Sequence, residues 1–198
     1  KGCCPKRDFD LEALEGVVCT GSPLTPESFS WIYDNVKSNL WVSSVSGGTD
    51  TATGFVGGVQ TLPVHSGELQ APCLGVDVQA FDVDGRPMVG AEGELVVTQP
   101  MPSMPLYFWN DPDGTRYHDA YFATFAGVWR HGDLLYVTER GSYVISGRSD
   151  STLNRHGIRI GTSEIYRTVE ALEGIADSII VHLDGNAGLD RLVLFILM

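Results

Sequence analysis

A sharp change of pattern at Gly147 constrains the fold of this chain more than any other feature. Before it, the sequence predicts a series of short β-strands, the last over residues 143–146. After it, a polar segment gathers Arg148, Arg155 and Arg159 among glycines, and residues 162–173 have the pattern of a helix. Such a switch is typical of a domain boundary. We therefore predict one domain over residues 1–149 and a second over residues 150–198.

The first part of the chain predicts a strand–helix–strand unit over residues 14–46. Thr25 suits a helix N-cap and Pro26 the first helical position. One apolar helix face follows at helical spacing, made by Phe29, Ile32, Tyr33 and Val36. Buried strands are expected on both sides of this helix. This unit is the building block of a parallel sheet.

From about residue 60 to residue 149 the pattern is typical of a small antiparallel sheet or β-barrel. The expected strands are Val76–Val83, Gly93–Thr98, Leu134–Thr138 and Tyr143–Ser146, with turns at Asp84-Gly85 and Arg140-Gly141. Residues 99–127 are rich in proline and aromatic residues, and we expect a long functional or mobile loop there.

The second domain is predicted to be of α+β type. Its helix would bury Ile165, Val169 and Leu172, and two strands would follow over residues 177–183 and 191–198. An apolar strand such as the last is normally covered on both faces. We therefore expect the chain to belong to a longer protein.

Composition excludes several classes of function. The formal charge is -12, from 25 acidic and 13 basic residues, so we expect no nucleic-acid partner. No run reaches the roughly 18 apolar residues of a membrane span. The cysteines show neither zinc nor redox spacing, and reduced thiols in a cytoplasmic protein are the expectation.

A glycine-rich stretch, residues 44–54, is the first candidate for chemistry. Backbone N–H groups in such a loop can approach a phosphate closely, with Thr49 adding a hydroxyl. Asp50 would supply a hard oxygen ligand for Mg²⁺. A flexible turn without function is the alternative interpretation.

Three further residues could bind a nucleotide. Asp133, in the sequence HGD, could accept hydrogen bonds from ribose hydroxyls, although a simple turn aspartate fits too. Arg148 could contact phosphate or ribose oxygens, or form a surface ion pair. Arg159 could serve similarly, or be a solvated hairpin residue. His131 lies near Asp133, but no third metal ligand is evident.

The order of these motifs is more specific than any one of them. From about Gly16 to its end, the chain resembles the motif series of the adenylate-forming superfamily. The motifs are, in order, GSPL, GGTDTATG, GEL, HGDLLY and GRSDSTLNRHGIRIGTSEIY. Within that superfamily, the chain resembles acetoacetyl-CoA synthetases in SSVSGGTD, in the insertion at residues 100–122 and in GVWRHGD. The resemblance implies the carboxyl-terminal part of a large α/β domain with a β-barrel subdomain, joined by a hinge to a truncated α+β domain.

The resemblance also implies a reaction: acetoacetate attacks ATP to give an acyl-adenylate, and coenzyme A then displaces AMP. The nucleotide would be bound by Gly21, Ser22, Pro23, Gly48, Thr49, Asp133, Arg148 and Arg159. Thr49, Asp50 and Arg159 would be catalytic, with Mg²⁺ on Asp50. Asp150 would be the hinge, and His156 and Gly157 would line the coenzyme A channel.

Two departures from the superfamily bear on this assignment. Asp50 stands where glutamate is usual. Val45, Ser46 and Gly47 would line the acyl pocket, and Ser46 to Gly48 replace the stretch in which acetyl-activating relatives carry a tryptophan. The lost indole would leave room for an acid larger than acetate, so that Gly47→Trp would impair acetoacetate activation selectively.

The phosphate loop is expected upstream of Lys1 and the catalytic lysine beyond Met198, so residues 1–198 alone should be inactive. Ligation of another short or branched keto acid, or a non-catalytic nucleotide-binding module, remain alternatives.

Overall fold

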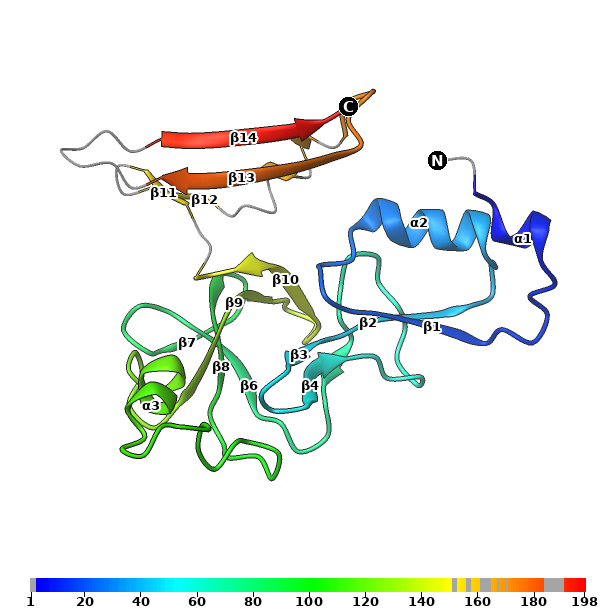
Figure 1. Ribbon diagram of the computed structural model, residues 1–198. Helices are drawn as coiled ribbons and strands as arrows, with labels where there is room; N and C mark the ends of the chain where they lie inside the picture. The colour runs from blue at the N-terminus through cyan, green and yellow to red at the C-terminus, as the bar shows by residue number, and fades with distance from the viewer. Residues whose placement is uncertain are drawn as a thin grey trace. The chain divides into compact units, whose positions relative to one another are not determined.

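The computed structural model describes residues 3–150, 153–155, 158–160, 165–166, 168–169, 171–183 and 191–198. The chain divides into two compact units, Lys1–Ile145 and Ser146–Met198. The fold is mixed, with most regular structure in strands (Figure 1). In chain order the elements are α1 (Pro5–Asp8), β1 (Gly16–Cys19), α2 (Pro26–Asn35), β2 (Trp41–Ser44), β3 (Ser46–Gly48), β4 (Thr53–Gly57), β5 (Ala71–Pro72), β6 (Val78–Phe81), β7 (Pro87–Met88), β8 (Glu92–Val97), α3 (Thr115–Tyr121), β9 (Trp129–Val137), β10 (Tyr143–Arg148), β11 (Leu153–Arg155), β12 (Ile158–Ile160), β13 (Asp177–Leu183) and β14 (Arg191–Leu197).

The predicted strand–helix–strand unit is confirmed. β1 and β2 pair in parallel, and α2 crosses between them over one face (Figure 1). The Thr25 hydroxyl accepts a hydrogen bond from the Ser28 N–H at 3.3 Å, and Pro26 opens the helix. Phe29 and Ile32 of the predicted apolar face are buried. The prediction that β1 is wholly buried is wrong, because only one of its faces packs on α2 and Val18 is 60% exposed.

Most of the first unit is a five-stranded sheet beside a three-stranded one. The strand orders are β10-β9-β8-β6-β7 and β3-β4-β5, and the two sheets contribute to one apolar core. That core includes Phe55 of β4, Leu95 of β8, and Trp129 and Leu135 of β9, all with at most 1% of their surface exposed. The four predicted strands overlap β6, β8, β9 and β10, although β9 begins at Trp129 and not at the predicted Leu134.

Two segments of the first unit differ from their prediction. The glycine-rich stretch is a β-hairpin rather than an irregular loop, because β3 and β4 pair antiparallel across it. The segment at residues 99–127, expected to be a loop, contains helix α3. The Asp111 carboxylate accepts hydrogen bonds from the N–H groups of Arg116 and Tyr117 at 3.1 and 2.9 Å, so a side chain stabilises the first turn.

The second unit contains two antiparallel pairs, β11–β12 and β13–β14. The two long strands confirm the prediction for residues 177–183 and 191–198. The predicted helix falls largely outside the described residues, although residues 165–166 and 168–169 are helical. Leu172, expected in its buried stripe, is 59% exposed because it lies in the turn at residues 171–174.

Candidate functional site

The hairpin β3–β4 presents Thr49 and Asp50 at its tip, and both residues are exposed. The turn beneath them is tightly held. The fully buried Thr51 hydroxyl donates to the Gly48 carbonyl at 3.0 Å, the Ala52 N–H donates to the Thr49 carbonyl at 3.1 Å, and Ala52 adopts a left-handed φ of 50°. A rigid turn with two exposed polar side chains is suited to contact an anionic ligand and its cation.

Gly47 has a structural role in this hairpin. A Cβ atom there would lie 2.3 Å from the Thr53 carbonyl oxygen and 2.7 Å from the Gly54 Cα. The strands can therefore approach this closely only because Gly47 lacks a side chain. This differs from the interpretation that the glycine leaves space for the acid, and it changes what Gly47→Trp is expected to do: the variant would force the hairpin apart.

Strand β9 carries an irregularity that places Asp133. Glu94 pairs with Leu134, but two residues further along β8, Val96 pairs with Arg130, so β9 accommodates two extra residues. Gly132 lies in this bulge with a φ of 87°. The Glu94 carboxylate compensates for the interrupted ladder, since it accepts a hydrogen bond from the Gly132 N–H at 3.0 Å and pairs with Arg130 at 3.2 Å.

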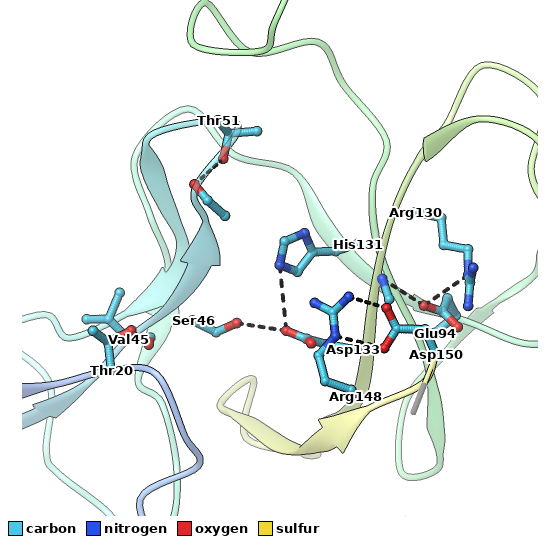
Figure 2. A network of polar contacts seen from close by, with 12 residues as sticks. Thr20, Val45, Ser46, Thr51, Glu94, Arg130, His131, Asp133, Arg148 and Asp150 are labelled. Carbon is cyan, nitrogen blue, oxygen red and sulfur yellow. Dashed lines mark hydrogen bonds and ion pairs between the residues drawn. The ribbon is translucent and has the colours of Figure 1, made fainter. Parts of the chain in front are cut away.

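The bulge brings Asp133 to the β3–β4 hairpin. The Ser46 hydroxyl donates to the Asp133 carboxylate at 3.3 Å, and the His131 Nε2 lies 3.8 Å from the same oxygen (Figure 2). The His131 ring stands edge-on to Phe55, with centroids 4.6 Å apart and planes at 83°. A Cβ at Gly48 would come within 3.0 Å of His131, so this glycine also permits close packing. Asp133 is thus a nearly buried carboxylate held from two sides.

The carboxyl ends of the two parallel strands meet beside this network. The Thr20 hydroxyl donates to the Val45 carbonyl at 2.8 Å (Figure 2). The Val45 N–H donates to the Cys19 carbonyl at 2.9 Å. Gly21, Ser22 and Pro23 follow directly after β1 and are exposed. Ligands of open α/β sheets bind at such carboxyl ends. Hydrogen bonds thus link the segment after β1 to Val45, and the neighbouring Ser46 to Asp133, all within the first unit.

Asp50 accepts a hydrogen bond from the Tyr121 hydroxyl. Among the described residues, no three histidine, cysteine or acidic side chains gather as a metal site. A single exposed carboxylate fits Mg²⁺ chemistry where a nucleotide supplies further oxygens, because this ion commonly uses one or two carboxylates together with phosphates. Asp50 is thus suited to that ion in the presence of a nucleotide.

The remaining predicted residues fall in the second unit or outside the described residues. Arg148 pairs with Asp150 through its Nε at 2.9 Å and also through a terminal nitrogen, and both side chains are about half exposed. Exposed pairs of this kind contribute little stability, so the arginine can exchange partners at small cost. Arg159 lies in β12. His156 and Gly157 lie outside the described residues.

Burial and hydrogen bonds shift the pKa values of three groups in the first unit. Desolvation raises the pKa of the Cys73 thiol, whose sulfur would lie 3.1 Å from a Cβ at Gly54, and it raises the pKa of Tyr117 in α3. Hydrogen bonds from Thr115 lower the pKa of Asp113, at the start of that helix. Folding therefore favours the neutral forms of Cys73 and Tyr117 and the charged form of Asp113.

The sequence reasoning missed Tyr121 and the support that Glu94 and Ser46 give to β9. Tyr121 follows Tyr117 at a spacing of four, which is typical of one helix face, but the surrounding prolines favoured a loop. Glu94 was part of a recognised GEL motif without an assigned contact. No local signal shows that Ser46 reaches Asp133, which is 87 positions away.

Comparisons with known proteins show which proteins this chain is similar to. No family model matches the chain. The chain is 44% identical over 195 residues to the acetoacetyl-CoA synthetase of Danio rerio, covering 98% of this chain and 29% of that protein. It is 47% identical over 195 residues to the acetoacetyl-coenzyme A synthetase of Rhizobium meliloti (strain 1021), covering 98% and 30%. It thus spans about 30% of the length of these curated relatives.

Two solved structures resemble this chain in their fold. An acetoacetyl-CoA synthetase from Streptomyces lividans superposes with a TM-score of 0.84 and 53% identity, covering 97% of this chain and 29% of that one. The anthranilate CoA ligase AuaEII, solved in complex with anthranoyl-AMP, gives a TM-score of 0.73 at 18% identity, covering 96% and 35%. The second likeness shows the fold alone.

Proposed function

We propose that this chain, homologous over nearly its whole length to about 30% of acetoacetyl-CoA synthetases, forms part of a ligase that joins acetoacetate to coenzyme A. The identity of 44–47% to two such proteins carries the proposal. The geometry supports it, since hydrogen bonds link the segment after β1 to Val45, and the neighbouring Ser46 to Asp133, all within the first unit. These are the residues that the motif series assigns to the nucleotide and the acid.

The reaction has two steps. An oxygen of the acid's carboxylate attacks the α-phosphorus of ATP, and the bond to pyrophosphate breaks. The sulfur of coenzyme A then attacks the acyl carbon, and the bond to AMP breaks. Such chemistry depends mainly on positioning and charge stabilisation.

In this proposal Asp133 accepts hydrogen bonds from the ribose hydroxyls. Its orientation is fixed by the Ser46 hydroxyl at 3.3 Å and by the bulge that Glu94 stabilises. Gly21, Ser22 and Pro23 line the adenine site at the end of β1. Because Asp133 is 8% exposed, it loses little freedom on binding and its hydrogen bonds form in a partly desolvated setting.

At the hairpin tip, Thr49 donates to a phosphate oxygen and Asp50 holds Mg²⁺. The cation would reduce the negative charge of the ATP phosphates. Val45, Ser46 and Gly47 face the acid. Arg148 and Arg159 would bind negative groups of the nucleotide, Asp150 would be the hinge, and His156 and Gly157 would line the coenzyme A channel. The sequence prediction of a cytoplasmic enzyme is part of the same proposal. Among the described residues, no helix is long and apolar enough to cross a bilayer.

The test is acid-dependent release of AMP by the full-length protein, with ATP, Mg²⁺ and coenzyme A. We expect turnover with acetoacetate to exceed turnover with acetate, propionate and branched keto acids. Asp133→Ala should raise the KM for ATP at least tenfold, because the variant loses a charged hydrogen-bond acceptor. A preference for another keto acid would overturn the assignment of acetoacetate as the substrate. Nucleotide binding without any AMP release would favour a non-catalytic module.

A further inference from the structure

The aromatic helix α3 reaches the tip of the glycine-rich hairpin. Tyr121, the last residue of α3, donates its hydroxyl hydrogen to the Asp50 carboxylate across 71 positions of sequence. Both residues lie in the first unit. The segment that carries α3 is the insertion rich in proline and aromatic residues, whose contacts the sequence did not predict.

The position of Tyr121 is set by packing and not by Asp50. Its ring stacks on the Trp129 indole, with centroids 3.5 Å apart and planes at 14°. Trp129 belongs to β9, is 1% exposed and forms part of the central core. Phe108 and Tyr117 meet the Tyr121 ring edge-on at 6.0 and 5.9 Å. Such aromatic contacts stabilise one ring orientation.

Helix α3 is itself fixed at its start, because the buried Asp111 carboxylate accepts two backbone hydrogen bonds from its first turn. The phenol therefore approaches Asp50 from a rigid support. Asp50, by contrast, is exposed on a turn, where a carboxylate without a partner samples several rotamers.

We infer that Tyr121 is a positioning residue, which orients the Asp50 carboxylate for the cation–nucleotide complex. The inference rests on the proposed function. The hydroxyl holds one carboxylate oxygen and leaves the other for the cation. An aspartate side chain is short, so the direction in which its carboxylate points decides whether it can reach a ligand.

The experiment compares two hydroxyl deletions in the full-length protein. Tyr121→Phe removes the donor and retains the stacked ring, while Tyr117→Phe removes a hydroxyl from the same helix and aromatic cluster. Binding of Mg²⁺ with a non-hydrolysable ATP analogue is measured by calorimetry, and initial rates are measured against Mg²⁺ concentration. We expect Tyr121→Phe to weaken Mg²⁺-dependent nucleotide binding about three- to tenfold, with kcat at saturating Mg²⁺ changing less than twofold. Tyr117→Phe should match the wild type.

A double-mutant cycle separates positioning from general stabilisation. In an Asp50→Asn background, Tyr121→Phe should add less than about twofold, because the charged acceptor is already lost. Equal Mg²⁺ dependence in Tyr121→Phe, Tyr117→Phe and wild type would overturn the inference, as would an equal further loss in the Asp50→Asn background. If the wild type releases no AMP with any acid but binds Mg²⁺ and nucleotide, the proposed function fails while calorimetry still tests Tyr121.

Discussion

Replacing Gly47 with alanine should impair the proposed ligase activity towards every acid, and not towards acetoacetate alone. The new Cβ would lie 2.3 Å from the Thr53 carbonyl oxygen and 2.7 Å from the Gly54 Cα, both backbone atoms of the facing strand. Real Cβ atoms essentially never approach non-bonded atoms within 3.0 Å, so the strands must separate by about 0.7 Å. Overpacking against backbone costs about 1–3 kcal/mol.

The separation of the strands moves the turn that carries Thr49 and Asp50. A displacement near 1 Å at a reacting centre costs about a hundredfold. We therefore expect kcat/KM to fall about 30- to 100-fold, or about 2–2.7 kcal/mol of transition-state stabilisation. The ratio of kcat/KM for acetoacetate to that for acetate should stay within about twofold of the wild-type ratio, because the cause is the hairpin and not the volume of the pocket.

The assay is AMP release by the full-length protein at several concentrations of each acid. Gly57→Ala, in the same hairpin, is the matched control. Its Cβ would meet side-chain atoms of Val45 and Cys73 at 3.3 and 3.6 Å, so a loss below about fivefold is expected. Wild-type kcat/KM in Gly47→Ala, or a loss confined to acetoacetate, would refute the steric reasoning and restore the interpretation of Gly47 as space for the acid.

Three further predictions, each measured on the full-length protein, concern two supports of the site and one core residue. Ser46→Ala should raise the KM for ATP about two- to tenfold in initial-rate assays, because Asp133 loses a donor. Glu94→Ala should lower the free energy of unfolding in urea by about 1–3 kcal/mol, since the Gly132 N–H loses its acceptor; an unchanged urea midpoint would contradict this. Burial, together with Asp77, raises the pKa of Tyr143, so folding favours the neutral phenol. The stability that this preference contributes is complete below about pH 10. That contribution is lost as pH rises through the folded-state pKa, and Tyr143→Phe should flatten the fall in urea midpoint over that range; an equally steep fall in the variant would count against it.

Local signals in the sequence were sufficient for much of the fold. The spacing of Phe29 and Ile32 predicted α2 and its buried face, and Thr25 and Pro26 predicted where the helix begins. A β pattern divided by turns at Asp84-Gly85 and Arg140-Gly141 predicted strands that overlap β6 and β8 to β10. These predictions were confirmed because helix and strand periodicities are properties of neighbouring residues, which packing then uses.

The same local signals were misleading where glycine and proline have a tertiary purpose. Gly47 suggested a loop, yet it allows β3 to approach β4. The prolines before α3 suggested a loop throughout, yet Asp111 stabilises a helix within that segment. A backbone preference shows which conformations are permitted, but a close neighbour from elsewhere in the chain decides which one forms.

For the candidate site, the sequence by itself determined which residue types are present and the order in which their motifs occur. That order, with the residues Thr49, Asp50 and Asp133, was enough to indicate the superfamily. Only the tertiary structure decided that Ser46 supports Asp133 and that Tyr121 supports Asp50, across 87 and 71 positions of sequence. Contacts at such separations depend on sheet register, on the β9 bulge and on the aromatic packing of α3, none of which leaves a periodic trace in the chain.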